Sequence, residues 1–208
     1  MEVNEPAVKY ASLKGMNPLE YIEWESTQPE KNEYIAGSIY AMAGASINHN
    51  TIQSNLIGSI HPFLKGKDCN IYASDLRVFV KSKEAFFYPD ATIVCGEIEL
   101  AEEFKETVKN PSVVFEILSP STEHYDMGKK FFNYMQIDTL KETIAIDSRE
   151  MNIKIGRRKA NNLWAFEELT QANQIFAIET IQFSMSVKDI YNQVKLSSTP
   201  GENQTSNA

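Results

Sequence analysis

Hydrophobic residues recur with two different periods along the chain, and these periods predict where helices and strands form. The clearest helical pattern follows Ser46, which suits an N-cap, and ends before Gly66. Its apolar positions are spaced four residues apart, at Ile52, Leu56, Ile60 and Leu64. Residues 18–26 begin with a proline and predict a short helix. Residues 33–43 predict a β-hairpin with Gly37 at its turn.

The middle of the chain carries strand patterns, and one of them encloses a carboxylate. Residues 69–80 predict one or two strands, and residues 86–95 predict another strand that a proline interrupts. Residues 96–110 are acidic and contain lysine, so they predict a solvated connection or a short helix. Residues 112–119 form a nearly continuous apolar run around Glu116. Such a run is typical of a central strand that is buried on both faces.

The second half of the chain adds a helix and further strands. Ser121 or Thr122 suits the N-cap of a helix that runs through Lys129 to about Gln136. The remaining segments predict a strand at 143–147, β-ribbons at 151–185 and a short helix at 187–194. This order of elements predicts an α/β fold, a sandwich with a central mixed β-sheet flanked by helices and with extra β-ribbons.

The length and the composition of the chain predict one folded domain with two weakly structured ends. The chain has 208 residues, of which 42% are hydrophobic, and this suits a single core. We expect residues 18–195 to form the domain and residues 1–17 to be loosely ordered. Residues 196–208 end the chain in a stretch poor in large apolar side chains, which predicts a disordered tail.

The net charge and the two cysteines limit the classes of function that the sequence allows. The net charge of −8 argues against a protein that coats nucleic acid non-specifically, because that affinity rests on Lys and Arg. It leaves room for an enzyme whose carboxylates hold a cation. Cys69 and Cys95 lie in apolar stretches, and we expect buried free thiols rather than a zinc site or a disulfide. With neither a transmembrane run nor a secretory signal, the cytoplasm is the expected location and no membrane partner is expected.

Two carboxylates are candidates for metal chemistry. Glu116 lies inside an apolar strand, where a carboxylate must be paired, hydrogen-bonded or bound to a metal. Asp90 follows a proline in the preceding strand, at a point where the ladder is interrupted. Carboxylates on neighbouring strands can face one hard cation such as Mg²⁺, which prefers oxygen ligands. A cation held in this way can polarise a phosphoryl oxygen and acidify a bound water.

A lysine on the next helix is the third candidate. Lys130 lies on the helix that follows the Glu116 strand, and such a helix tends to pack back against the sheet. From there, a lysine can orient the attacking water or neutralise charge on a phosphate. Taken alone, Lys130 would be better explained as a surface lysine beside Lys129.

The candidate residues belong to a longer pattern that covers roughly residues 18–190. The matching stretches are Glu33 to Gly37, Met42 to Ser46 with His49, Ser74 to Val78, Tyr88 to Asp90, Glu116 to Thr122, and Asp126 through Lys130 to Tyr134. In this order and spacing, the chain resembles the "putative restriction endonuclease" family of the PD-(D/E)xK nuclease superfamily. The resemblance implies an endonuclease that hydrolyses phosphodiester bonds in DNA. It also implies Mg²⁺ as the cofactor, with Mn²⁺ able to substitute.

The same resemblance implies the roles of the site residues. Asp90 and Glu116 would bind the metal, and both would act in catalysis together with Lys130. The superfamily pattern places its lysine two positions after the glutamate, where this chain has Leu118. The family resemblance therefore carries the role to Lys130 rather than Lys129. These two side chains point about 100° apart on a helix, so at most one reaches the site.

Three further residues are additional site candidates. Superfamily members often supply a glutamate from the first helix, but residues 47–64 contain none. His49 at the start of that helix, or Glu33 in the preceding hairpin, can complete the site. Each also has a structural explanation, as a hydrogen-bonded histidine or an anchor of the hairpin. Asp75 can be a ligand or a turn former, and we favour the structural role.

Two other functions compete with the nuclease. The first is a catalytically inactive module on the same fold that binds nucleic acid or protein, which the acidic charge favours. The second is a glycosidase that uses Asp90 and Glu116 as acid and base, a mechanism that needs no metal. For a nuclease that cuts both strands of a duplex we expect a homodimer, because two-fold dimers are the commonest oligomers.

Overall fold

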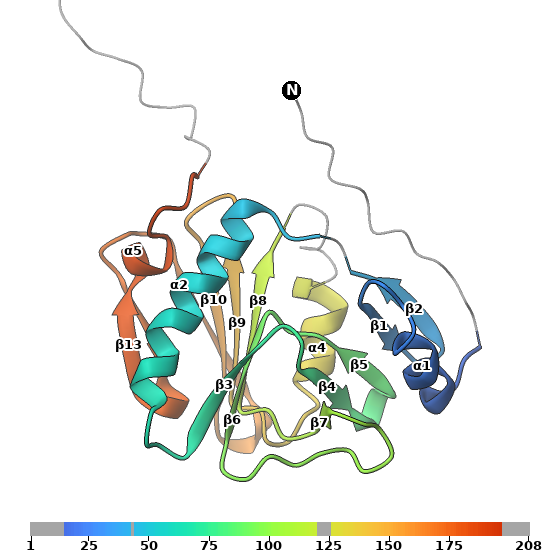
Figure 1. Cartoon of the computed structure of the whole chain (residues 1–208). Helices are drawn as coiled ribbons and strands as arrows, with labels where there is room; N and C mark the ends of the chain where they lie inside the picture. The colour runs from blue at the N-terminus through green and yellow to red at the C-terminus, as the bar shows by residue number, and fades with distance from the viewer. Residues whose placement is uncertain (1–14, 43, 120–125, 197–208) are drawn as a thin grey trace, which may run out of the picture.

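The computed structural model describes residues 15–42, 44–119 and 126–196 of the chain. Two β-sheets form the body of the protein, with helices packed between and around them (Figure 1). Helices α2 and α5 lie on one side of the molecule, and α1 lies on the other side, beside β1 and β2 (Figure 1). The mixed α/β architecture predicted from the sequence is therefore confirmed.

The first sheet has five strands in the order β2-β1-β5-β4-β7. Its strands are β1 (Asn32–Ile35), β2 (Ser38–Ala41), β4 (Arg77–Val80), β5 (Ala85–Phe87) and β7 (Thr107–Val108). The predicted hairpin is β1–β2, and Gly37 lies in its turn with a φ of 88°. Helix α1 (Pro18–Glu25) starts with a capping box from Asn17 and buries Tyr21 against Tyr34 and Phe86.

The second sheet has six strands in the order β11-β10-β9-β8-β6-β3. Its strands are β3 (Cys69–Ala73), β6 (Ala91–Cys95), β8 (Val113–Leu118), β9 (Glu142–Asp147), β10 (Ile153–Arg158) and β11 (Trp164–Leu169). Every residue of β8 is buried, and β8 runs antiparallel to β6 and parallel to β9. The prediction of a central strand buried on both faces is confirmed.

Helix α2 (Ile47–Leu64) covers one face of this sheet. Its N-cap is Ser46, as predicted, and the Ser46 side chain accepts a hydrogen bond from the His49 amide. The four apolar positions predicted for α2, Ile52, Leu56, Ile60 and Leu64, are all buried in the core. A hairpin of β12 (Ile175–Ile178) and β13 (Phe183–Ser186) completes this core together with α5 (Val187–Ile190). Three short 3₁₀ turns connect strands, at Lys81–Lys83, Ala160–Asn162 and Glu179–Ile181.

The opposite face of the second sheet packs toward the first sheet through α4. A π-helical turn (Asp126–Lys130) leads into α4 (Phe131–Tyr134). Tyr134 lies in one apolar cluster with Val114 of β8 and Phe87 of β5. The predicted caps Ser121 and Thr122 lie outside the described residues. Lys130 is thereby held between the two sheets.

Two expectations about strands need correction. Residues 86–95 form two strands in different sheets rather than one interrupted strand, because the chain crosses from β5 to β6 at the Pro89–Asp90 step. The polar connection 96–110 also contains β7, which pairs in parallel with β4 and buries Val108. A two-residue strand is too short to leave a periodic signal.

The expectation of free buried thiols is wrong. Cys69 and Cys95 form a disulfide, and both are partly buried. The antiparallel register of β3 and β6 places these two residues directly opposite each other. The spacing of cysteines along a chain contains no information on register, so only the pairing of the strands reveals the bond.

The N-terminal boundary of the domain differs from the expected one. Residues 15–17, which we expected to be loosely ordered, are attached: the Gly15 amide donates to the Gly37 carbonyl, and Tyr34 donates its hydroxyl hydrogen to the Met16 carbonyl. Residues 1–14 and 197–208 lie outside the described part of the chain. Within that part, each helix is too short or too polar to cross a membrane.

Candidate active site

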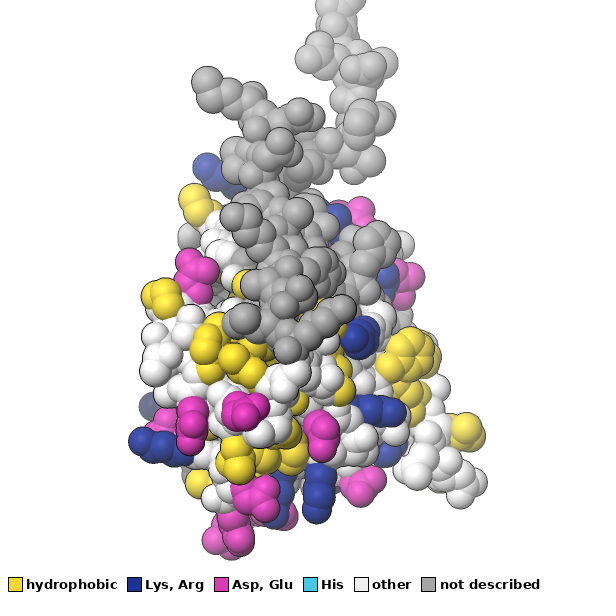
Figure 2. Space-filling view, turned by 90° about the vertical axis from the view of Figure 1, so that its right-hand side faces the viewer, with side chains coloured by type: hydrophobic (Ala, Val, Ile, Leu, Met, Phe, Trp, Pro, Cys, Tyr) yellow, Lys and Arg dark blue, Asp and Glu magenta, His cyan; other side chains and the backbone are white. Residues whose placement is uncertain are grey.

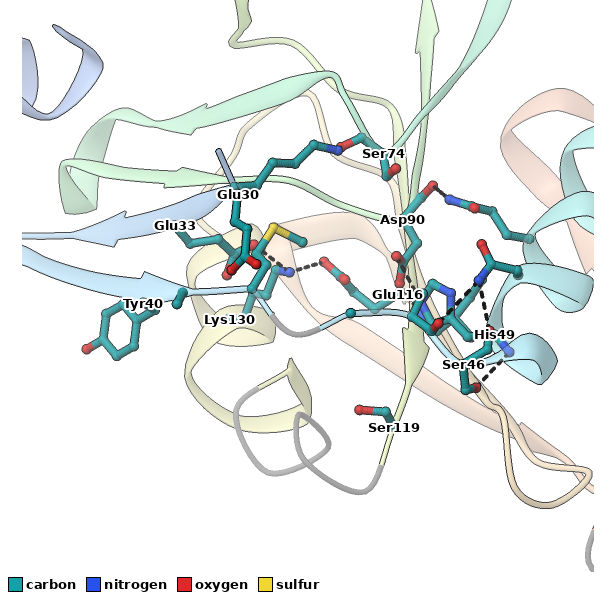
Figure 3. Close-up of a pocket in the computed structure, with 18 of the residues that line it drawn as sticks. Glu30, Glu33, Tyr40, Ser46, His49, Ser74, Asp90, Glu116, Ser119 and Lys130 are labelled. Atoms are coloured by element: carbon teal, nitrogen blue, oxygen red, sulfur yellow. Dashed lines mark hydrogen bonds and ion pairs between the residues drawn. The ribbon is translucent and has the colours of Figure 1, made fainter. Parts of the chain in front are cut away.

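A cavity of about 440 Å³ opens where the β1–β2 hairpin, the start of α2 and the strands β6 and β8 meet. Five of the six predicted site residues line it, namely Glu33, His49, Asp90, Glu116 and Lys130 (Figure 3). These residues come from segments that are far apart in the sequence. The two sheets and α2 therefore have to assemble before the site exists.

Asp90 lies at the crossing from one sheet to the other, immediately before β6. Because Ala91 pairs with Phe115, the strand register brings Asp90 beside Glu116 on β8. The Asp90 Oδ2 atom accepts a hydrogen bond of 2.6 Å from the Ile117 amide. Its backbone carbonyl accepts another from the Gln53 side chain on α2 at 2.7 Å. Both contacts hold the carboxylate at the cavity wall.

Glu116 is the buried carboxylate in the middle of the sheet. Its Oε1 atom lies 2.9 Å from the Lys130 Nζ atom and accepts a hydrogen bond of 2.7 Å from the Tyr134 hydroxyl. Burial raises the pKa of Tyr134 well above its ordinary value, and the nearby Glu116 raises it further. Tyr134 therefore stays protonated and remains a donor to the carboxylate.

Lys130, rather than Lys129, reaches this carboxylate. The Lys130 Nζ atom lies between Glu33 and Glu116, 2.8 Å and 2.9 Å from their nearest oxygens, and its side chain is only 3% exposed (Figure 3). Lys129 is exposed and donates to the Tyr40 hydroxyl instead. A buried ammonium is stable only when it is paired. The two carboxylates supply that pairing.

Glu33 on β1 is the second partner of Lys130. Its Oε1 atom also accepts a hydrogen bond of 3.1 Å from the Tyr88 amide, two residues before Asp90. One carboxylate therefore connects the hairpin, the lysine and the Pro89–Asp90 crossing. The structure brings Glu33 into the site, and its contribution to the chemistry stays a prediction.

His49 approaches the site from the first turn of α2. Its Nε2 atom lies 3.0 Å from the Asp90 Oδ1 atom. Among the described residues, the buried Nδ1 atom of His49 has no hydrogen-bond partner. Asp75, in contrast, lies outside the cavity, with a side chain that is 90% exposed and paired with Lys31. The position of Asp75 fits the structural role favoured from the sequence.

Tyr134 is the residue of this site to which sequence reasoning assigned no role. It follows Lys130 by four positions, so both side chains lie on one face of the helix. Both also contact the same oxygen of Glu116. The four-residue spacing from Lys130, already a candidate, is the feature of the sequence that could have identified Tyr134.

The carboxylate oxygens of the site are of the donor type that a hard divalent cation prefers. Glu33 and Glu116 contact the ammonium of Lys130, and Asp90 lines the same cavity beside His49. Within the described residues, no group of three or more His, Cys, Asp or Glu side chains is arranged to hold a metal. A cation here would therefore take few protein ligands and keep several waters, as Mg²⁺ commonly does.

The fold and this site together define an α/β protein of the restriction-endonuclease-like kind. The chain matches the Uma2 family, described as "Putative restriction endonuclease", over residues 18–188. This match extends over most of the chain, so the protein belongs to the Uma2 family.

Two proteins of Synechocystis sp. and a solved structure from Anabaena variabilis are among those similar to the chain. Uncharacterized protein slr1290 of Synechocystis sp. is 33% identical over 181 residues, which are 87% of this chain and 94% of that protein. Uncharacterized protein sll1609 of the same organism is 31% identical over 163 residues, or 78% of this chain and 92% of that protein. The solved structure, of "a putative nuclease belonging to DUF820" from Anabaena variabilis, has a TM-score of 0.72 at 19% identity, over 87% of this chain and 100% of that one. At that identity, the likeness confirms the fold.

Proposed function

We propose that this protein is a metal-dependent endonuclease that hydrolyses phosphodiester bonds in DNA, with Mg²⁺ as its cofactor and Mn²⁺ able to substitute. One observation carries the proposal: the buried Glu116 contacts the buried Lys130 at a cavity wall that Asp90 also lines. A carboxylate pair beside an ammonium suits phosphoryl transfer, which depends on positioning and on neutralising charge. The name of the family and that of the solved neighbour support the same chemistry.

Each site residue has a defined role in this proposal. Asp90 and Glu116 would hold the cation, and the cation would polarise the phosphate and acidify a water. Lys130 donates hydrogen bonds to the attacking water or to a phosphate oxygen, because its ammonium borders the cavity. Glu33 and Tyr134 keep Lys130 and Glu116 in position through the contacts described above. Water attacks the phosphorus and releases its proton to solvent, while the displaced sugar oxygen leaves with the bonding electron pair and takes up a proton from solvent.

The surface charge restricts how DNA can be bound. Basic and acidic side chains are interspersed over the lower part of the face shown in Figure 2. Together with the net charge of −8, this pattern favours binding through the site and its cation rather than through a broad basic surface.

The test is nicking of supercoiled plasmid in Mg²⁺ or Mn²⁺ by the parent protein and by Asp90→Asn, Glu116→Gln and Lys130→Met. We expect cleavage to require the metal, and each variant to lose about 10²–10³-fold in rate, the usual cost of removing one charge-stabilising group. Lys129→Met is the matched control, because Lys129 is adjacent but exposed, and we expect it to retain activity. Metal-independent cleavage would contradict the proposal and point to contamination or another mechanism.

A second candidate is a binding module without catalysis. One observation favours it: both oxygens of Asp90 already have partners within the protein, Ile117 and His49. In this case, calorimetric titration with Mg²⁺ and Mn²⁺ would show no binding, and the parent would never nick plasmid. Binding of either ion that Asp90→Asn abolishes would instead favour the nuclease.

A further inference from the structure

An aromatic patch lies outside the cavity, on the α4 side of the second sheet. It consists of Phe131 and Phe132 on α4 and of Trp164 and Phe166 on β11. Phe132 and Phe166 are 65% and 66% exposed. A largely apolar cavity of about 600 Å³ lies between the two phenylalanines of α4 and Phe166. Contiguous exposed aromatic surface of this kind marks an interaction site more often than a free surface.

Strand β11 forms the edge of the sheet beside this patch. Among the described strands, β11 pairs only with β10, so its outer backbone edge faces no other strand. The four consecutive residues 165–168 are all exposed. Proteins usually protect such an edge with lysine, proline or a bulge, and β11 contains neither lysine nor proline. Its backbone groups are therefore available to another strand.

We propose that two copies of this chain pair through β11, antiparallel, about a two-fold axis that passes beside Phe166. This arrangement joins the two sheets edge to edge. It places Phe166 directly opposite Phe166 of the partner subunit, where aromatic pairs stabilise a sheet. A symmetric pairing of one surface with itself is the commonest way in which proteins form dimers.

The charges of β11 favour a second copy in this register. With Phe166 at the axis, Ala165 lies opposite Glu167 of the partner subunit, and Trp164 lies opposite Glu168 of the partner subunit. Each carboxylate then faces an uncharged residue. A shift of the axis to between Glu167 and Glu168 would place carboxylates opposite each other, which is destabilising.

Each carboxylate of β11 also has a partner within its own chain. Glu167 forms an ion pair with Arg157, and Glu168 accepts a hydrogen bond of 2.7 Å from the Asn152 side chain. The strand can therefore approach its copy without bringing unpaired charges together. Because β11 lies three strands away from β8, the pairing leaves the candidate active site open.

The first test measures the mass of the full chain by sedimentation velocity over a wide range of protein concentrations. We expect the parent to reach twice the mass of one chain, and Phe166→Lys to remain monomeric because two ammonium groups would meet at the axis. Leu19→Lys is the matched control: Leu19 is an apolar residue on α1 that is 54% exposed, and the dimer should persist. Circular dichroism confirms that each variant is folded.

The second test examines the register. Under mild oxidation, Phe166→Cys should form a covalent dimer on a non-reducing gel, whereas Leu19→Cys should not. A parent that stays monomeric at every concentration would overturn the proposal. So would a dimer that survives Phe166→Lys, or one that Phe166→Cys fails to cross-link. Neither readout requires cleavage or metal, so the dimer and the nuclease can fail separately.

Discussion

Two cation–carboxylate clusters with a buried cation lie in the described part of the chain, and their comparison shows what distinguishes a candidate site from a structural ion pair. The site cluster consists of Glu33, Lys130 and Glu116. The ribbon cluster consists of Glu142, Arg157 and Glu167. In both, a strand carboxylate meets a cation that is at most 10% exposed. Glu142 and Glu116 even lie on neighbouring strands of one sheet.

The ribbon cluster is closed by backbone hydrogen bonds. Besides Arg157, Glu142 accepts hydrogen bonds from the amides of Glu179 and Thr180, at 3.1 Å and 2.8 Å. Arg157 also donates to the Ala177 carbonyl on β12. Burial alone would lower the pKa of Arg157, but its hydrogen bonds to Glu167 and Glu142 outweigh this and raise it. The cluster thus joins the hairpin β12–β13 to the sheet.

The site cluster borders a cavity, and Asp90 lines the same cavity as a further carboxylate. A ligand can therefore reach the charges of the site cluster. Burial of a carboxylate in a strand does not by itself indicate function, because Glu142 meets the same criterion. Glu116 is set apart by its access to a cavity and by a second carboxylate, Asp90, that has no lysine or arginine partner among the described residues.

The largest expected effect is a loss of stability in Arg157→Met, which removes the cation of the ribbon cluster and leaves the site cluster intact. Removing the cation leaves Glu142 buried beside two amides only, so the free energy of unfolding should fall by about 3–5 kcal/mol. Urea unfolding measures this change. Plasmid nicking per folded molecule should stay at the parent level, and a loss of nicking with folding intact would mean that the ribbon cluster also serves the site.

A smaller effect is expected from Glu33→Gln, which keeps an acceptor for the Tyr88 amide and removes one charge from Lys130. Residues that orient a catalytic group usually contribute about 10–100-fold, so nicking should slow by that factor. Glu30→Gln is the matched control, because Glu30 lines the same cavity but is exposed. Equal losses in both variants would show that general charge, rather than the Lys130 contact, matters.

Gly156→Ala tests how tightly the sheet beside Arg157 is packed. A Cβ at this position would lie 2.7 Å from Thr143 Oγ1 and 3.0 Å from the Phe131 ring. Overpacking of this kind costs about 1–3 kcal/mol in the free energy of unfolding. Gly58→Ala on α2 meets nothing within 4 Å and should instead stabilise the protein by about 0.5–1 kcal/mol. Thermal unfolding of the two variants measures the expected loss of stability for Gly156→Ala and the expected gain for Gly58→Ala.

The smallest change in stability is expected from Glu25→Gln. Glu25 is a buried carboxylate that forms no ion pair with a lysine or arginine among the described residues. Burial raises the pKa of Glu25 above its ordinary value of 4.5. A raised pKa in the folded state means that stability falls as the pH rises from 4.5 through the folded pKa. Glu25→Gln should remove this fall, so the variant should be more stable than the parent at neutral pH and equal to it below pH 4.5. The free energy of unfolding of both proteins is measured across this pH range. An equal pH dependence in the parent and the variant would contradict the prediction.

Much of the fold follows from local patterns in the sequence. The four-residue spacing from Ile52 to Leu64 defines α2, and the apolar run around Glu116 defines the buried β8. Short elements without a period, such as β7, escape such reasoning. The sequence also singles out Asp90, Glu116 and Lys130 as candidates, and the first two become neighbours through strand pairing.

By itself, the sequence determined the order of the longer elements, the burial of Glu116 and the break in the chain before Asp90. Only the tertiary structure decided which residues meet: Cys69 with Cys95, Glu33 with Lys130, and Tyr134 with Glu116. The physical reason is that hydrophobic periodicity is a local property, whereas strand register and helix orientation depend on packing between distant segments. The same limit explains why two buried strand carboxylates, Glu116 and Glu142, have surroundings that only the folded protein reveals.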